Sequence, residues 1–434
     1  MSAMAASTLR QRGNDKVDAV IAGAGAAGAI LAARLSAQRR KVVILEIGPA
    51  WKQDDLWSSN LWSRRIKWGG APVELGGTHP NGYTFETGWG NGGSAIHHYG
   101  QWPRLHESDF RCQSLFGRGV DWPITYDDLR PWYDRVQERV GVSGDHTREP
   151  WRPPGAPYPL PPLATFRQAE VLAEGFRKIG VRTGPMPMAI LSKPYKGRPA
   201  CIYDGWCDAG CPTGALAQPL VSDLPEALKN GARLVNGADV TRVLGSDDGR
   251  RVLGVEYVDA SGERREVHAD VVILANNCIQ GARVLLNSAT AKHPDGLGNR
   301  SGTVGRYLMT HFAAGVKGLF DVDMQNHLGA TGCGLLGQDG YGRSEGSYSW
   351  LIAPAHKMAN IIGMANADTT LFGEALHEFM RKAARGMGSM VAIGEQMPRA
   401  GNRLVLSATR DAHGMPLVRW ENAFDEREQK QFTV

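Results

Sequence analysis

VDAVIAGAGAAG, which runs from Val17 to Gly28, is the stretch of sequence that decides the fold. An apolar run with β-branched residues leads into Gly23, Gly25 and Gly28 at G-x-G-x-x-G spacing, and a run of small residues from 29 to 36 follows at once. The pattern predicts a strand, a tight turn and a helix. Gly23 permits the turn, Gly25 lets a pyrophosphate approach the backbone, and Gly28 lets helix and strand pack closely.

A second predicted strand, from Lys41 to Leu45, ends in an acidic residue, Glu46. A carboxylate at this distance from the glycine turn can accept a hydrogen bond from a ribose 2'-hydroxyl. The strand, helix, second strand and acid together predict a dinucleotide site. The alternative is a glycine-rich turn without function, since G-x-G-x-x-G alone is a weak signal.

Length and charge narrow the class of protein. A chain of 434 residues is long enough for two domains around a large core. The net charge of +5 includes no dense basic block, so the sequence favours neither nucleic acid nor a polybasic membrane anchor as a partner. No apolar run has the length of a membrane span, and the first residues contain no signal-peptide core, so folding in the cytoplasm is the default expectation.

A second glycine-rich stretch, GWGNGGSAIHHYG, spans residues 88 to 100. Gly88, Gly90, Gly92 and Gly93 crowd together just before two histidines, which lets backbone approach a second part of a large cofactor. The alternative is a plain turn. The stretch closes a passage from Trp51 that lacks clean periodicity and predicts ordered loops.

Three of the six cysteines cluster in CIYDGWCDAGCP as Cys201, Cys207 and Cys211. Three thiolates within eleven residues, with glycines between them, can surround one soft metal centre. The spacing suits a three-iron cluster, or a four-iron cluster completed by a group such as Asp208. Zinc is disfavoured because structural zinc sites show paired spacing and four ligands, and a disulfide plus a free thiol is the remaining alternative.

Regular elements follow the pattern of a two-part α/β protein. Helices are predicted over 126–140, 168–179 and up to residue 229, with an extended proline-rich connector over 147–162. Strands are predicted over 232–235, 238–244, 252–259 and 267–274. The last of these is continuously apolar, which suits a buried parallel position beside the first glycine turn and favours FAD over NAD.

Several segments together resemble the glucose-methanol-choline (GMC) oxidoreductases over nearly the whole chain, and most of all the gluconate 2-dehydrogenase and FAD-dependent glucose dehydrogenase large subunits. The matching segments are VIAGAGAAGAILAARLS with LEIGP, GNGGSAIHHYGQWPR, DWPITYDDLRPWYDR, the cysteine loop, VVILANNCIQGARVLLNS, SGTVGRYLMTH and EQMPRAGNRLVLS.

The resemblance implies an α/β fold with a Rossmann-like FAD/NAD(P)-binding domain and a second α+β substrate domain built on a mixed or antiparallel sheet. The expected division is 1–310 for the FAD-binding domain, with an excursion over 145–220 that carries the cysteine cluster, and 311–434 for an incomplete substrate domain.

The resemblance also implies the residues that bind FAD. They are expected at three parts of the cofactor: Gly23, Gly25, Gly28 and Glu46 at the ADP end, Val240 near the adenine, and Gly90, Gly92, Gly93 and Ser94 near the flavin. His97 matches the histidine to which some relatives attach the flavin covalently, although His98 stands where those relatives usually have Trp. A hydrogen-bonding or structural role for His97 is the alternative, and His311 is expected to be structural.

In relatives with this cysteine spacing, the three thiolates hold a [3Fe-4S] cluster. Carried over, Cys201, Cys207 and Cys211 would pass electrons from flavin to a cytochrome c subunit. Such large subunits are exported with a small partner that carries a twin-arginine signal. The expected location is therefore periplasmic, with membrane association only through partner subunits, or cytoplasmic if the chain is unpartnered.

The implied activity is oxidation of a CH–OH group in a sugar, sugar alcohol or sugar acid, with electrons passing to a cytochrome or quinone. The family's catalytic His pair would lie beyond Val434, so no catalytic residue is assigned, and the chain is expected to be a fragment that is weakly active or inactive. Two alternatives remain, namely a GMC alcohol or sterol oxidase without a cluster and a non-catalytic flavoprotein subunit.

Overall fold

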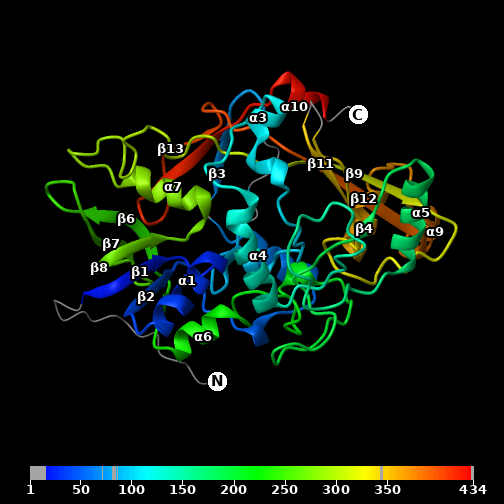
Figure 1. Cartoon of the computed structure of the whole chain (residues 1–434), viewed down its shortest axis with the longest axis horizontal. Coiled ribbons are helices and arrows are strands. Elements are labelled where there is room, and N and C mark those ends of the chain that lie inside the picture. Colours follow the sequence, from blue (N-terminus) through cyan, green and yellow to red (C-terminus); the bar gives the residue numbers. More distant parts are fainter. Residues whose placement is uncertain (1–15, 71, 81–84, 86, 343–345, 432–434) are drawn as a thin grey trace.

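A computed structural model describes residues 16–70, 72–80, 85, 87–342 and 346–431 of the chain. Figure 1 shows two large sheets at opposite sides of the molecule, with the helix α4 (Tyr126–Val140) between them. No helix in these described ranges is long and apolar enough to cross a membrane.

The first sheet has six strands in the order β5-β2-β1-β8-β7-β6. Their bounds are β1 Val17–Ala22, β2 Val42–Glu46, β5 Arg233–Asn236, β6 Asp239–Gly245, β7 Val252–Val258 and β8 Arg264–Leu274. β1 pairs in parallel with both β2 and β8, and Ala22 lies opposite Leu45 on one side and Leu274 on the other. The carboxyl ends of three strands therefore meet at one edge, where parallel α/β sheets bind ligands.

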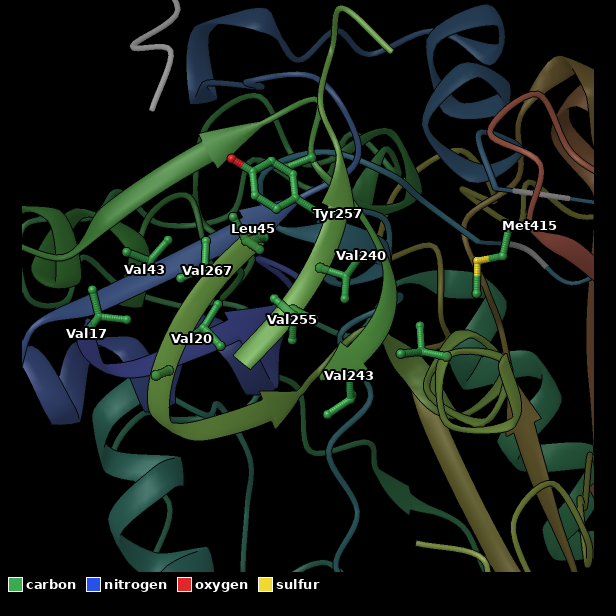
Figure 2. Close-up of a cluster of buried hydrophobic side chains, with 14 residues drawn as sticks. Val17, Val20, Val43, Leu45, Val240, Val243, Val255, Tyr257, Val267 and Met415 are labelled. Atoms are coloured by element: carbon green, nitrogen blue, oxygen red, sulfur yellow. The ribbon is translucent and has the colours of Figure 1, made fainter. Parts of the chain in front are cut away.

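The two faces of this sheet differ in what covers them. Figure 2 shows one face, where Val20, Val240, Val255 and Tyr257 gather in a single buried cluster. The other face is covered by helices α1 (Ala26–Ala37) and α6 (Asp223–Lys229). The alanines of α1 let it lie close to the strands, as the small-residue run predicted.

β8 confirms the predicted parallel partner of β1, but it is less buried than its sequence indicates. Val271 is 52% exposed, whereas Val272 and Leu274 pack on the core cluster. The apolar run therefore identified the strand correctly but overstated how fully neighbouring elements cover it.

The second sheet is antiparallel, in the order β4-β10-β11-β12-β9. Its strands are β4 Gly184–Pro185, β9 Phe312–Leu319, β10 Leu335–Gly340, β11 Tyr348–Ile352 and β12 Met387–Gly394. Helices of this half are α5 Arg167–Lys178, α8 Met358–Ala365 and α9 Gly373–Gly386, and Figure 1 shows α5 and α9 at its outer side. The antiparallel pairing agrees with the predicted second sheet.

His356 is buried and contacts both a helix and a strand of this half of the molecule. Its Nε2 lies 3.2 Å from Gln168 Oε1 on α5 and 3.1 Å from Ser389 Oγ on β12. Burial, with a smaller contribution from the charge of Lys317, lowers the pKa of His356 to about 4. The imidazole is therefore neutral in the folded protein near neutral pH.

Acid is expected to destabilise the protein through His356. The pKa of His356 is lower in the folded than in the unfolded chain. The neutral imidazole therefore contributes fully to stability above the unfolded pKa, and this contribution is lost as the pH falls towards the folded pKa. Protonation of His356 alone should lower the free energy of unfolding by about 2 kcal/mol between pH 7 and pH 5. Urea unfolding at both pH values measures the loss, and His356→Gln should show a smaller pH dependence. An unchanged dependence in that variant would contradict the assignment.

A third sheet joins distant parts of the chain, in the order β13-β14-β3. β3 (Val73–Gly76) pairs in parallel with β14 (Pro416–Glu421), which pairs antiparallel with β13 (Arg403–Arg410). Helix α7 (Asn277–Asn287) packs on β13 and β14, and Trp420 is fully buried. The prediction of loops alone after Trp51 is wrong, since β3 and α2 (Asn60–Lys67) lie there. Short strands and helices that pair with distant parts of the chain leave no clear local periodicity in the sequence.

The remaining short helices are α3 Cys112–Phe116, α10 Glu426–Lys430 and the 3₁₀ turns η1 Gln53–Asp55, η2 Gly93–Ile96, η3 Glu107–Phe110 and η4 Cys207–Ala209. α4 has the predicted bounds, and the other predicted helices and strands in residues 17–274 are found within a few residues of their predicted ends. The division into domains at residue 310 stays a prediction.

Candidate cofactor site

A cleft opens at the edge where β1, β2 and β8 end. It encloses about 950 Å³, part of it open to solvent. Residues from five segments line it: the first glycine turn, the end of β2, the second glycine stretch, the start of β6 and the start of α7. The predicted residues on its wall are Gly23, Gly25, Glu46, Gly93, Ser94 and Val240.

The structure gives Gly23 and Gly28 their predicted turn and packing roles, and pyrophosphate binding over Gly25 stays a prediction. Gly23 has φ +100°, and a Cβ there would lie 2.8 Å from the carbonyl oxygen of Ala275. A Cβ on Gly28 would lie 2.0 Å from the carbonyl oxygen of Gly23, so Gly28 serves packing rather than ligand contact. A Cβ on Gly25 would approach no protein atom closer than 3.8 Å, which leaves the space above Gly25 to a ligand.

The second glycine stretch packs directly against the first turn. The Gly92 amide donates to the Ala24 carbonyl at 3.1 Å, and a Cβ on Gly93 would lie 3.1 Å from Gly25 Cα. Ser94 closes the turn, because its Oγ accepts a hydrogen bond from the Gly88 amide at 3.0 Å. The predicted convergence of the two stretches is therefore present.

Glu46 is 4% exposed and holds three segments together. Its Oε2 accepts from the Ala24 amide at 2.9 Å, and its Oε1 accepts from the amides of Gly48 at 2.9 Å and Gly90 at 2.8 Å. Burial raises the pKa of Glu46, and these three hydrogen bonds oppose the rise. A carboxylate has about four acceptor positions, so one remains for a ligand hydroxyl.

Sequence reasoning missed the wall formed by Asn276, Asn277 and Gln280, and it missed Asp239. Asn276 Oδ1 is buried and has no hydrogen-bond partner among the described residues. Buried polar atoms are nearly always paired, so this atom fits a bound polar group. The two asparagines directly after an apolar strand were the available signal, because that position faces the ligand edge.

Two neighbouring histidines differ in their surroundings. His98 Nε2 donates to the Ala217 carbonyl at 2.7 Å, and its Nδ1 accepts from the Gly100 amide. His97 is 6% exposed, and its Nε2 is buried without a partner among the described residues. That nitrogen lies beside Gly88, which lines the cleft. Burial, then the charge of Lys67, lowers the pKa of His97 to about 4. Covalent attachment at His97 stays a prediction.

The three clustered cysteines approach one another in a second site, and all six cysteines of the chain are free thiols. Burial first, then the nearby Cys211 and Cys201, raises the pKa of Cys207 to about 12. The Tyr203 amide donates to Cys201 Sγ and the Leu216 amide to Cys211 Sγ, both at 3.3 Å. The predicted alternative of a disulfide is not present.

Arg198 supplies a positive charge beside this thiol cluster. It interacts electrostatically with Cys211, and its Nη1 is buried with no partner among the described residues. Its Nη2 donates to the Val140 carbonyl. Backbone donors on sulfur and a guanidinium with one nitrogen left unpaired fit an anionic thiolate centre. Within the described ranges, however, no group of three or more His, Cys, Asp or Glu side chains is arranged to hold a metal ion.

The prediction that Asp208 completes a four-iron cluster is wrong. Its Oδ2 accepts from Lys67 Nζ and Ser63 Oγ, each at 2.9 Å, and its Oδ1 accepts from Lys357 Nζ and from Thr331 Oγ1. Its two oxygens are already paired, and the sequence could not show this because the partners lie far away along the chain.

The sequence is similar to a known family and to known proteins. Residues 161–313 match the family model described as GMC oxidoreductase. The chain is 28% identical over 433 residues to 2-methyl-1,2-propanediol dehydrogenase of Mycolicibacterium austroafricanum, which covers 94% of this chain and 77% of the relative. It is 27% identical over 426 residues to the fructose dehydrogenase large subunit of Gluconobacter japonicus, which covers 92% of this chain and 78% of the relative.

Among solved structures, the fold is similar to that of a formate oxidase of Aspergillus oryzae, solved to examine the effect of a mutation on its FAD modification. The TM-score is 0.61 at 16% identity, with 95% of this chain and 78% of that chain covered. The predicted α/β fold class is therefore confirmed. The family match supports FAD as the cofactor of the cleft.

Proposed function

From the premise that this chain carries a GMC oxidoreductase N-terminal domain, we propose that the protein binds FAD in the cleft beyond β1 and β8 and oxidises the CH–OH group of an alcohol or sugar. One observation carries the proposal. Five segments of the chain converge on a cleft in which Gly25 leaves open space, Glu46 keeps an acceptor position and Asn276 presents an unpaired oxygen.

The residues of this chain have separate tasks in the proposed site. The backbone at Gly25 and the N-terminus of α1 would receive the pyrophosphate, and Glu46 would accept from a ribose hydroxyl. Gly93 and Ser94 line the same cleft and would bound the flavin. FAD, when bound, supplies the acceptor for a hydride from the alcohol carbon. Among the described residues, no side chain is assigned as the base that accepts the hydroxyl proton.

The test is flavin binding followed by reduction with substrate. The purified chain, mixed with FAD and desalted, should retain a protein-bound flavin absorption spectrum. Anaerobic addition of a panel containing a short diol, fructose and gluconate should bleach that spectrum with at least one member. Failure to retain FAD would overturn the proposed function. Bound FAD that no alcohol bleaches would favour the alternative of a non-catalytic flavoprotein subunit.

A second part of the proposal concerns the path of the electrons. We propose that Cys201, Cys207 and Cys211 hold a [3Fe-4S] cluster that passes electrons from flavin to a cytochrome or quinone. The thiol cluster, its two backbone donors and the unpaired Nη1 of Arg198 support this assignment. The alternative is an alcohol oxidase without a cluster, which would reduce oxygen directly.

Removing one cysteine is expected to remove the iron. The protein isolated anaerobically should contain about three iron atoms per chain, with labile sulfide, and Cys207→Ser should lose most of both. Cys333→Ser is the matched control, because Cys333 is a buried free thiol in the same hydrophobic cluster. Wild-type protein without iron or sulfide, or equal iron loss in both variants, would contradict the cluster.

Partner subunits and export complete the proposal. One relative is named as a large subunit, which supports a complex with a small subunit carrying a twin-arginine signal and with a cytochrome c subunit. The protein would then reach the periplasm and associate with the membrane only through these partners. Co-expression with the neighbouring genes followed by cell fractionation tests this: periplasmic recovery that depends on the small partner is expected. Recovery in the cytoplasm would contradict it.

A further inference from the structure

A buried group of three charges joins helix α2, the cysteine loop and the segment before α8. It consists of Lys67 at the end of α2, Asp208 in η4 and Lys357 just before α8. Asp208 is 7% exposed and Lys67 is 8% exposed. Lys67 Nζ donates to Asp208 Oδ2 at 2.9 Å and to the Tyr99 hydroxyl at 3.2 Å. The Lys357 ammonium pairs with the other oxygen of Asp208 and lies over the Trp206 ring.

The charges in this group do not cancel. One carboxylate faces two ammonium groups, so the group carries an excess of one positive charge in surroundings with little water. Buried charges act strongly on their neighbours because screening by solvent is weak.

Lys67 directly follows a residue whose backbone contacts the wall of the cleft. The preceding carbonyl, that of Ile66, would lie 2.8 Å from a Cβ on Gly88, and Gly88 lines the cleft. α2 also packs against η2, which begins at Gly93 on the cleft wall. His97 gives an independent indication, since the charge of Lys67 contributes to lowering its pKa and His97 Nε2 lies beside Gly88.

We propose that Lys67 raises the reduction potential of FAD bound in the cleft, and that Asp208 positions Lys67 and moderates its charge. The proposal rests on the proposed function, because it requires FAD in that cleft. Reduction by hydride adds negative charge to the cofactor, and a fixed positive charge nearby favours the reduced form. Lys67 is a positioned charge rather than a proton donor in this role.

The competing explanation is a purely structural ion-pair network. Asp208 joins α2, η4 and the segment before α8, so the loss of any member could loosen all three. A structural role predicts that removing either charge lowers stability and disturbs the flavin in the same way. The electrostatic role predicts opposite signs, because Lys67 is positive and Asp208 is negative.

The experiment measures the midpoint potential of the bound flavin by reductive titration of the full chain. Lys67→Gln should lower the potential and Asp208→Asn should raise it. Each should change the equilibrium between oxidised and reduced cofactor at least tenfold, which is about 30 mV for a two-electron couple. Lys382→Gln, which removes an exposed lysine on α9, is the control and should leave the potential unchanged.

Each outcome has a separate meaning. Shifts of opposite sign support the proposal, while shifts of the same sign or unchanged potentials overturn it. If Asp208→Asn does not fold, Lys357→Gln replaces it and should lower the potential by less than Lys67→Gln, because Lys357 lies on the far side of Asp208. An equal or opposite shift would overturn the proposal. Wild-type protein that binds no FAD would overturn the proposed function instead, whereas bound FAD with equal potentials in all variants overturns this inference alone.

Discussion

Replacing Gly25 with alanine should leave the protein folded and weaken FAD binding about a hundredfold or more, which corresponds to about 3 kcal/mol. Gly25 has φ −73° and ψ −170°, which alanine adopts without strain, and a Cβ there would meet no protein atom closer than 3.8 Å. The added methyl group would instead occupy the space into which a pyrophosphate must enter. Titration of apoprotein with FAD, followed by flavin fluorescence, measures the loss.

Gly28→Ala is the matched comparison, because it places the same methyl group three residues further along. Its Cβ would lie 2.0 Å from the carbonyl oxygen of Gly23, which is backbone and cannot move aside. The expected result is lost stability of the apoprotein itself, visible as a lower melting temperature by circular dichroism. If Gly25→Ala bound FAD as the wild type does, the pyrophosphate would not lie over this turn.

Glu46→Ala is expected to produce the largest loss of stability among single substitutions at the cleft. Three buried backbone amides, those of Ala24, Gly48 and Gly90, would lose their acceptor together. Each unsatisfied buried donor costs about 1–3 kcal/mol, so the total is comparable to the whole stability of many domains, about 5–15 kcal/mol. Urea unfolding of the apoprotein measures this loss independently of FAD.

Glu46→Gln separates the charge of this side chain from its hydrogen bonds. The amide keeps one oxygen as an acceptor but turns an NH₂ group towards a backbone donor, so an intermediate loss is expected. Glu74→Ala, which changes a carboxylate on β3 that accepts from Ser407, should cost far less. An apoprotein with Glu46→Ala that unfolds at the wild-type urea concentration would show that the two glycine stretches meet without this carboxylate.

Local sequence was a good guide wherever one short segment decides the structure. The spacing of Gly23, Gly25 and Gly28 predicted a strand, turn and helix, and the structure contains all three, with Gly23 in the turn and Gly28 in close packing as predicted. Glu46 was predicted as a ligand for ribose, and the structure adds that it accepts from three backbone amides. Both predictions concern residues that lie within about thirty positions of one another in the sequence.

Contacts between distant segments were beyond sequence reasoning. Asp208 looked like a possible iron ligand because it stands next to Cys207, yet its partners Lys67 and Lys357 lie 141 and 149 residues away. The wall formed by Asn276 and Gln280 was missed although the parallel pairing of β8 with β1, which brings α7 to the cleft, was predicted.

The sequence by itself determined that this chain builds a dinucleotide-binding unit, because glycine conformations and the strand-to-helix period are fixed by neighbours along the chain. Only the tertiary structure decided that β3 pairs with β14, that Glu46 joins both glycine stretches, and that Lys67 and Lys357 both pair with Asp208. These features arise from long-range packing. The free energy of such contacts depends on which surfaces the whole fold brings together, and no local pattern of residue types specifies it.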